Sequence, residues 1–282
     1  MKTVLVAGAT GYLGRYLCAE YQARGWTVVA LVRDAGRAGE LAADRMVEAQ
    51  ATRPETLAGA MSGADLVVSA LGITRQRDGL SYRDVDYQAN LNLLTRAIQD
   101  RVPQFAYIHV LNADRMAGVP LVAAKSAFVR ALQEAPIRST VIAPSGYFSD
   151  MTDFLSMARG GRVWLFGRGE ARLNPIHGAD LAKATADAVD GGVAWLDAGG
   201  PDVFTQNELA RLCFDTVGKP ARITRLPDML RRAAIRILPR VAPARIAGPA
   251  QFFLTAMGLE MVGQRFGTHH LADHFRRLHA DG

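Results

Sequence analysis

The sequence predicts an α/β fold: a doubly wound parallel sheet, with a smaller, mostly helical region after it. Along the first 145 residues, short apolar segments such as 3–8, 26–32 and 65–71 alternate with segments of helical periodicity. Strands that alternate with helices of this length pair in parallel through right-handed crossovers. The strand segments are apolar throughout, as expected where helices cover both faces of a sheet.

Composition places the chain among ordinary globular proteins. Of its 282 residues, 49% are hydrophobic and 21% are charged, which is enough to form a sizeable core. We expect Cys18 and Cys213 to be buried small hydrophobes rather than a disulfide pair. The apolar segments are shorter than the roughly 18 residues of a membrane span, and the N-terminus reads as a strand rather than a signal peptide. We therefore expect a cytoplasmic location.

The first half of the chain follows a regular order. Strands are expected at 3–8, 26–32, 46–50, 65–71, 105–111 and 138–143. Helices are expected between them at 11–24, 54–61, 81–100 and 121–134. The helix over 81–100 is supported by the helical spacing of its apolar residues, which are Val85, Ala89, Leu93, Leu94 and Ile98.

After Pro144 the alternation becomes less regular. Helices are expected at 147–159, from Asp180 onward and at 205–217, and strands at 162–166, 193–198 and 221–226. From Asp228 the pattern is helical and basic. Because no Gly-, Ser- or charge-rich linker interrupts the chain, residues 1–145 are expected to form a core and residues 146–282 to be interleaved with it.

The strongest motif is a glycine-rich loop between the first strand and the first helix. Gly8, Gly11 and Gly14 follow a GxxGxxG spacing, with Thr10, Tyr12 and Leu13 between them. Glycine there permits a tight turn, the approach of a pyrophosphate and close packing of helix on strand. The helix N-terminus offers free N–H groups and partial positive charge to the phosphates. The motif predicts a dinucleotide site.

The end of the second strand indicates which dinucleotide. An acid there would bind a ribose 2′-hydroxyl and repel a 2′-phosphate, whereas the Arg33 guanidinium would bind the phosphate. Asp34 lies near the expected position of such an acid, but it also suits the N-cap of a following helix. We favour Arg33 as the phosphate ligand, and hence NADP(H) over NAD(H). Arg37 is either a second ligand of the phosphate or a surface arginine.

These motifs resemble those of a known family. The GATGYLGRYL segment from Gly8 to Leu17, with ALVRD at 30–34, is similar to the atypical short-chain dehydrogenases/reductases. The likeness is greatest to NAD(P)H-binding NmrA-like proteins and to the group of divinyl-chlorophyllide reductase and the complex I 39-kDa subunit. It extends through segments 124–128, 143–148 and 174–182. The resemblance implies a Rossmann-type sheet with the cofactor across its strand ends.

The resemblance also implies which residues surround the cofactor. Ser69, Ala70, Leu71 and Gly72 should flank adenine and its ribose. Leu111 and Asn112 should lie near the nicotinamide ribose, and Pro144, Ser145 and Gly146 near the nicotinamide. Lys125 is expected to bind ribose hydroxyls; the alternative for it is an exposed lysine on a helix surface.

The usual proton donor of that family is missing. Its active members carry a tyrosine four residues before the lysine, whereas this chain has Leu121 before Lys125. Leucine cannot donate a proton, so the resemblance supports cofactor binding more strongly than catalysis. Tyr147, after the Pro144–Gly146 turn, is the substitute acid we consider, with packing or substrate shape as the alternative.

The histidines indicate structure rather than a metal centre. His109 lies among apolar neighbours and is expected to be a core histidine with its hydrogen bonds satisfied. The family resemblance implies that His177, with Asp180, belongs to a structural motif whose loop packs beneath the cofactor site. The adjacent pair His269–His270 would point in different directions on a helix, and no spacing completes a metal site.

Positive charge is concentrated in the last part of the chain. Residues 219–282 hold 11 basic and 4 acidic residues, a net charge of +7, whereas the rest carries −1. Residues 228–259 combine arginines with apolar residues and leave three readings open: helices packed on the body, a lid or substrate wall, or contact with a membrane surface or partner protein. No nucleic-acid-binding motif accompanies these arginines.

Two functions follow from these observations. The first is an NADP(H)-dependent oxidoreductase acting on a small apolar carbonyl or alkene. The second is a non-catalytic NADP(H)-binding protein that senses redox state or assists the assembly of a partner. Leu121 is the residue that keeps the second function open.

Overall fold

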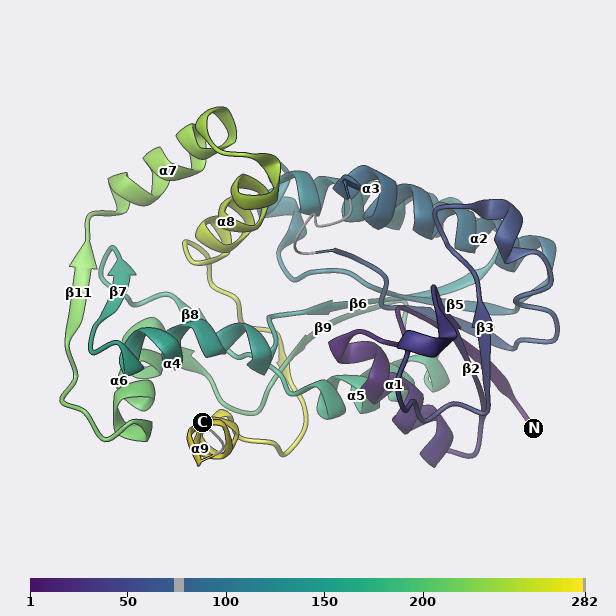
Figure 1. The fold of residues 1–282 in the computed structure, drawn as a ribbon, viewed down its shortest axis with the longest axis horizontal. Helices are drawn as coiled ribbons and strands as arrows, with labels where there is room; N and C mark the ends of the chain where they lie inside the picture. Colours follow the sequence, from purple (N-terminus) through teal and green to yellow (C-terminus); the bar gives the residue numbers. More distant parts are fainter. Residues whose placement is uncertain (74–78, 281–282) are drawn as a thin grey trace.

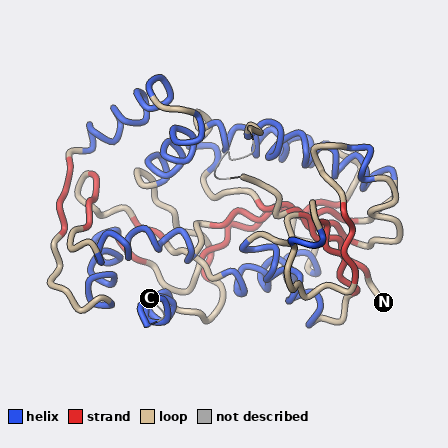
Figure 2. Tube along the Cα trace, viewed as in Figure 1, coloured by secondary structure: helices blue, strands red, loops and turns tan. Residues whose placement is uncertain are grey.

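A computed structural model describes residues 1–73 and 79–280. Its centre is a sheet of eight described strands, all parallel, in the order β12-β9-β6-β5-β4-β1-β2-β3 (Figures 1 and 2). The strands are β1 (Thr3–Ala7), β2 (Thr27–Val32), β3 (Arg45–Glu48), β4 (Leu66–Ser69), β5 (Gln104–Ile108), β6 (Arg138–Pro144), β9 (Trp195–Gly199) and β12 (Gln264–Arg265). The predicted doubly wound sheet is confirmed.

Helices cover both faces of this sheet. Helices α1 (Tyr12–Ala23) and α5 (Gly178–Asp190) pack on one face, where Val4 and Val6 of β1 point. Helices α2 (Asn90–Gln99) and α3 (Pro120–Glu134) pack on the other, where Leu5 and Ala7 point (Figure 1). Successive residues of a strand point to opposite faces of the sheet, and helices cover both faces. Residues on both faces must therefore be apolar, which explains why the strands are apolar throughout.

Two predicted helices of the first half differ in the structure. The segment 54–61 forms only a 3-10 turn, Pro54–Leu57, and Gly59 then adopts a positive φ of 73° that a helix cannot continue through. The segment 81–100 begins as a π-helix, Arg83–Ala89, before α2. The Asn90 side chain donates to the carbonyl oxygens of Val85 and Asp86, at 3.1 and 3.2 Å, and so stabilises the wider turn.

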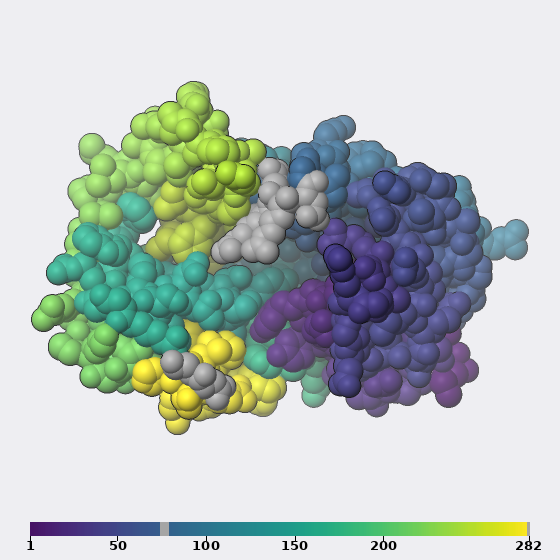
Figure 3. Space-filling model, in the orientation of Figure 1, coloured from purple at the N-terminus to yellow at the C-terminus, as the bar shows by residue number. Residues whose placement is uncertain are grey.

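The second half builds a smaller lobe beside the sheet. Its elements are α4 (Thr152–Arg159), α6 (Gln206–Thr216), α9 (Leu271–Ala280), the parallel pair β7 (Val163–Phe166) with β11 (Ile223–Leu226), and the antiparallel pair β8 (Arg172–Leu173) with β10 (Phe204–Thr205). Phe154, Phe214 and Phe275 are buried together at its centre. Figure 3 shows this lobe in green and yellow beside the purple and blue first half.

The two halves share one sheet. Strand β9 pairs with β6, and β12 extends the same sheet beyond β9. The prediction that the chain is helical throughout after Asp228 is therefore wrong at Gln264–Arg265, because the backbone there pairs with the open edge of β9. Helices α7 (Asp228–Val241) and α8 (Ala244–Ala256) form a hairpin in the part of the chain between β11 and β12 (Figure 1). Within residues 1–73 and 79–280, every helix is too short or too polar to cross a membrane.

Candidate functional site

The glycine loop is shaped by three different constraints. Gly8 has a φ of +80°, and a Cβ on it would lie 3.0 Å from the backbone of Ala70 in the neighbouring strand end. A Cβ on Gly14 would lie 2.0 Å from the Gly8 carbonyl oxygen, so only glycine lets α1 pack this closely on β1. Gly11 precedes the helix and donates its N–H to the Gly8 oxygen at 2.9 Å. The α1 N-terminus is thus held at the carboxyl ends of the strands.

At the end of β2, Asp34 caps a short 3-10 helix, Ala35–Arg37. Its Oδ1 accepts a hydrogen bond from the Arg37 backbone N–H at 3.2 Å, and its other oxygen lies 3.4 Å from the Arg37 guanidinium. Arg15 of α1, which sequence reasoning missed, fixes the same loop by donating to the carbonyl oxygens of Ala38 and Glu40. Arg33 and Arg37 are exposed. Asp34 has the cap geometry that the sequence allowed.

A cavity of about 670 Å³ runs from the glycine loop across the strand ends. Several predicted site residues line it: Gly11, Tyr12, Leu13, Gly14, Ala70, Gly72, Lys125, Pro144, Ser145, Gly146 and Tyr147. The other predicted residues lie outside its lining: Gly8, Thr10, Arg33, Asp34, Arg37, Ser69, Leu71, Leu111 and Asn112. Within this set, the Ser69 hydroxyl donates to Asn90 at 2.6 Å and the Asn112 amide to the Glu260 carbonyl oxygen at 2.6 Å.

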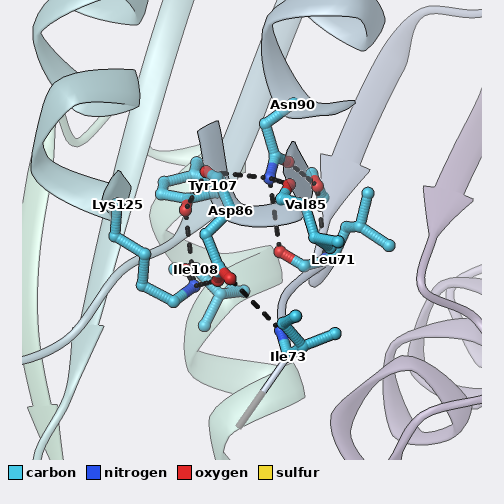
Figure 4. A network of polar contacts seen from close by, with 9 residues as sticks. Leu71, Ile73, Val85, Asp86, Asn90, Tyr107, Ile108 and Lys125 are labelled. Carbon is cyan, nitrogen blue, oxygen red and sulfur yellow. Dashed lines mark hydrogen bonds and ion pairs between the residues drawn. The ribbon is translucent and has the colours of Figure 1, made fainter. Parts of the chain in front are cut away.

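Lys125 is held at the floor of the cavity by a polar network (Figure 4). Its Nζ donates to the carbonyl oxygen of Ile108 at 3.0 Å and to the Tyr107 hydroxyl at 3.3 Å. It also forms an ion pair with Asp86 Oδ1 at 3.5 Å. Only 13% of the Lys125 side chain is exposed. The alternative of an exposed surface lysine is therefore wrong.

Asp86 is a candidate residue that sequence reasoning missed. It lies in the π-helix, its side chain is fully buried, and it lines the cavity. Burial raises its pKa to about 6, although the nearby Lys125 charge acts in the opposite direction. Its Oδ1 accepts no hydrogen bond from the described residues. The sequence signal that could have identified Asp86 is an acidic residue directly after Val85 and three residues before Ala89, which are two of the apolar positions of the predicted helix.

The position of the missing tyrosine faces the same cavity. Leu121 lies one turn before Lys125 in α3, is 5% exposed, and lines the wall. No proton can come from this side chain. The cavity therefore has a cation and a carboxylate near its floor, with an apolar group where a phenol would stand.

His109 is buried, but not with its hydrogen bonds satisfied as predicted. Its Nδ1 has no hydrogen-bond partner among the described residues, and the residue lines the cavity just after β5. Burial, and secondarily the Lys125 charge, lowers the pKa of His109 to about 3, so the ring is neutral near pH 7. His109 follows directly after β5, at the end of the sheet that borders the cavity. A position with apolar neighbours in the sequence therefore forms part of the cavity wall.

Tyr147 contacts the glycine loop side of the cavity. Its ring packs edge-on against Tyr12 with centroids 5.6 Å apart. Burial raises the pKa of its hydroxyl well above the usual value, so it stays protonated. The role of Tyr147 as a proton donor stays a prediction.

The C-terminal histidines tie the smaller lobe to the sheet. His177 caps α5 by accepting the Ala179 N–H at 3.3 Å, and its ring stacks on His269 at 4.2 Å. His269 in turn contacts Asp180 through Nδ1 at 2.8 Å. The pair His269–His270 precedes α9 rather than lying on a helix as predicted. Across residues 1–73 and 79–280, no cluster of three His, Cys, Asp or Glu side chains could hold a metal ion.

The far wall of the cavity is apolar and comes from α8. It is formed by Phe252, Phe253 and Ala256, with Leu259 and Met261 just beyond the helix. The exposed ion pair between Arg172 and Glu260, at 2.8 Å, lies next to this wall. Of the three readings of segment 228–259, the structure thus shows a cavity wall for α8.

Comparisons with known proteins agree with this geometry. Residues 8–191 match the protein family described as NAD(P)H-binding. The chain is 28% identical over 236 residues to the photosystem II assembly factor Ycf39 of Synechocystis, covering 79% of this chain and 70% of that protein. It is 29% identical over 267 residues to the divinyl chlorophyllide a 8-vinyl-reductase of Oryza sativa, covering 85% of this chain and 65% of that protein.

Among solved structures, the fold is similar to the NADPH-dependent quinone oxidoreductase QOR2 of Escherichia coli, solved in complex with NADPH. The TM-score is 0.76 at 18% identity, over 98% of this chain and 99% of that one. The glycine cradle and Asp86 Oδ1, which accepts no hydrogen bond from the described residues, also fit a bound dinucleotide, since the first leaves room for phosphates and the second can accept from a hydroxyl. By its matching residues and its sheet, the chain belongs to the NAD(P)H-binding family.

Proposed function

We propose that the protein is an NADP(H)-dependent oxidoreductase acting on a small apolar carbonyl or alkene. The observation that carries the proposal is the single cavity that joins the glycine loop, Lys125 and the phenylalanines of α8. A nucleotide site at one end and an apolar wall at the other suit a cofactor and an apolar substrate in contact. The relative named a reductase supports the same reaction class.

Each part of the site has a role in this proposal. The α1 N-terminus binds the pyrophosphate, and Arg33 with Arg37 binds the 2′-phosphate, which favours NADP(H). Lys125 and Asp86 bind ribose hydroxyls as donor and acceptor, and Pro144–Gly146 orients the nicotinamide. The bound nicotinamide supplies or accepts the hydride.

In this proposal, Lys125 stabilises the negative charge that develops on the substrate during the reaction. Its ammonium is fixed by Ile108 and Asp86 and faces a cavity with many apolar lining residues, where one cation stabilises negative charge on a substrate oxygen strongly. Leu121 and the neutral His109 keep that region apolar. Substrates whose reduced form is a stabilised anion, such as quinones and enones, suit this arrangement because they need no protein acid at the same instant.

The first test is calorimetric titration of the protein with NADPH and with NADH. Tighter binding of NADPH is expected, followed by NADPH consumption with at least one member of a panel of quinones, enones and aldehydes. Lys125→Met should retain the fold and lose turnover. Binding of neither nucleotide would overturn the proposal.

A second function is favoured by Leu121. The buried leucine removes the proton donor, and one relative is named an assembly factor rather than an enzyme. In this case the protein binds NADP(H) and serves as a redox sensor or assembly partner. Tight NADPH binding with no consumption across the whole panel would favour it over the oxidoreductase.

A further inference from the structure

The α7–α8 hairpin exposes an unusual number of large apolar side chains, from the start of α7 to the first turn of α8. Ten large hydrophobic residues are exposed among the described residues, and half of them lie within 229–246. These five are Met229, Leu230, Ile237, Val241 and Ile246, which are 51–73% exposed. We call the exposed residues of this segment the hairpin surface; it lies at the upper left of Figure 3. Burying them on a partner would remove apolar area that water now contacts.

The hairpin surface is also strongly basic. No Asp or Glu occurs between Met229 and Leu259, whereas five arginines do. Asp228 pairs with Arg231 and Arg232. Arg236, Arg240 and Arg245 are exposed and have no acidic partner among the described residues. Three cations therefore lie among the exposed apolar side chains without compensating charge.

This combination decides among the partners that could cover it. A second copy of the chain would bring the same arginines face to face across a symmetric interface, and like charges there are unfavourable. A simple solvated helix surface would not expose Leu230, Ile237 and Val241 together. Arginines beside partly inserted apolar side chains suit the boundary between anionic headgroups and acyl chains. We propose that the hairpin surface docks on an anionic lipid bilayer.

The position of the surface makes docking relevant to the cavity. Helix α8 follows the exposed turn, and its residues Phe252 and Phe253 line the cavity. Docking would therefore place the apolar wall of the cavity within one helix of the membrane. This step goes beyond the proposed reaction, because docking needs neither cofactor nor turnover.

The test is co-sedimentation of the full chain with vesicles of phosphatidylcholine alone or mixed with phosphatidylglycerol. We expect binding only to the anionic vesicles, weakening as salt rises because surface charge is screened. Arg236→Gln with Arg240→Gln should weaken binding roughly 25-fold, about fivefold for each arginine. Ile237→Asp with Val241→Asp should abolish binding. Arg53→Gln with Arg130→Gln, an equal charge change at exposed sites elsewhere, should leave binding unchanged.

Circular dichroism and NADPH titration of each variant separate docking from folding and from the cofactor site. None of the substituted residues lines the cavity, so nucleotide affinity should be unchanged. Equal binding to neutral and anionic vesicles, no binding to either, or equal loss in the Arg53/Arg130 control would each overturn the proposal. Concentration-dependent self-association that disappears in Ile237→Asp would assign the surface to a second copy instead.

Discussion

At the residue scale, the glycines of the nucleotide loop differ in what a side chain would meet. A side chain at position 14 would collide with the backbone, because a Cβ added to Gly14 would lie 2.0 Å from the Gly8 carbonyl oxygen. Gly11 has an ordinary φ of −74°, and its Cβ would approach only that same oxygen at 3.2 Å. Both glycines line the cavity, but only Gly14 is required by the packing of α1 on β1. The sequence spacing alone gives both the same weight.

Gly11→Val and Gly14→Ala should therefore fail in different ways. Gly11→Val is expected to fold with a nearly unchanged melting temperature and to lose NADPH binding, because its branched side chain occupies the phosphate space. Gly14→Ala is expected to lower the melting temperature, since α1 must move off β1. Calorimetric titration and thermal unfolding of both variants check this; equal loss of stability in the two would contradict it.

Arg33→Asp should change the nucleotide preference. Replacing a cation by a carboxylate removes the proposed phosphate contact and adds an acceptor for a 2′-hydroxyl, a shift of about 1–3 kcal/mol from NADPH toward NADH. The ratio of the two dissociation constants measures it. Arg53→Asp, a matched exposed arginine, should leave the ratio unchanged, and an unchanged ratio in Arg33→Asp would remove Arg33 from the site.

Asp86→Asn should remove a pH dependence of stability. Since burial raises the Asp86 pKa to about 6, the folded protein keeps a proton that the unfolded chain loses near pH 4. The wild type therefore loses stability as pH rises from about 4 to 6, and the asparagine variant does not. The free energy of unfolding of the variant minus that of the wild type should rise by about 2 kcal/mol over this range. Denaturant unfolding at both pH values measures the change.

At the element scale, the sequence predicted best where an element packs along its whole length. Strands β1 and β2 and helices α1 and α3 lie within one or two residues of their predicted bounds, because their apolar spacing is continuous. The π-helix Arg83–Ala89 could not be read from that spacing, since it depends on the Asn90 side chain capturing two carbonyl oxygens. Asp86 reaches the cavity from this segment, so the least predictable element carries the missed residue.

The cap of α5 predicts an acid-sensitive element. Burial, then the neighbouring His269, lowers the His177 pKa to about 4, so the folded protein holds it neutral while the unfolded chain protonates it near pH 6.5. Stability from this residue is complete above about pH 6.5 and is lost as pH falls toward 4. His177→Asn keeps a capping group without the titration, so it should lose about 1–2 kcal/mol less than wild type between about pH 7 and 5. Denaturant unfolding at the two pH values tests it; equal losses would contradict this account.

At the scale of the whole molecule, the site is assembled from segments far apart in the chain. The glycine loop, Lys125, the 144–147 turn and α8 meet in one cavity. The sequence identified the first three, because each follows a strand end or a recognisable motif. The α8 wall remained one reading among three, since an amphipathic helix does not show which surface its apolar face covers. The return of β12 to the sheet had no signal, because two residues are too few for a pattern.

The predicted boundary near residue 145 can be tested with fragments. Residues 1–145 lack α5, which covers one face of the sheet, and β9, which pairs with β6. We expect this fragment to expose its core, bind a hydrophobic dye and unfold without cooperativity, whereas residues 1–200, which keep both elements, should be more compact. Cooperative unfolding and NADPH binding by residues 1–145 alone would show an independent domain.

The late return of β12 has a consequence for how the protein folds during synthesis. The edge of β9 stays unpaired until residues 264–265 have left the ribosome, although most of the sheet is already available. An open strand edge is a template for pairing with other chains. The nascent protein therefore passes through a window in which its sheet is largely complete but open at one side, and this interval is when chaperone binding or misassembly would act on it.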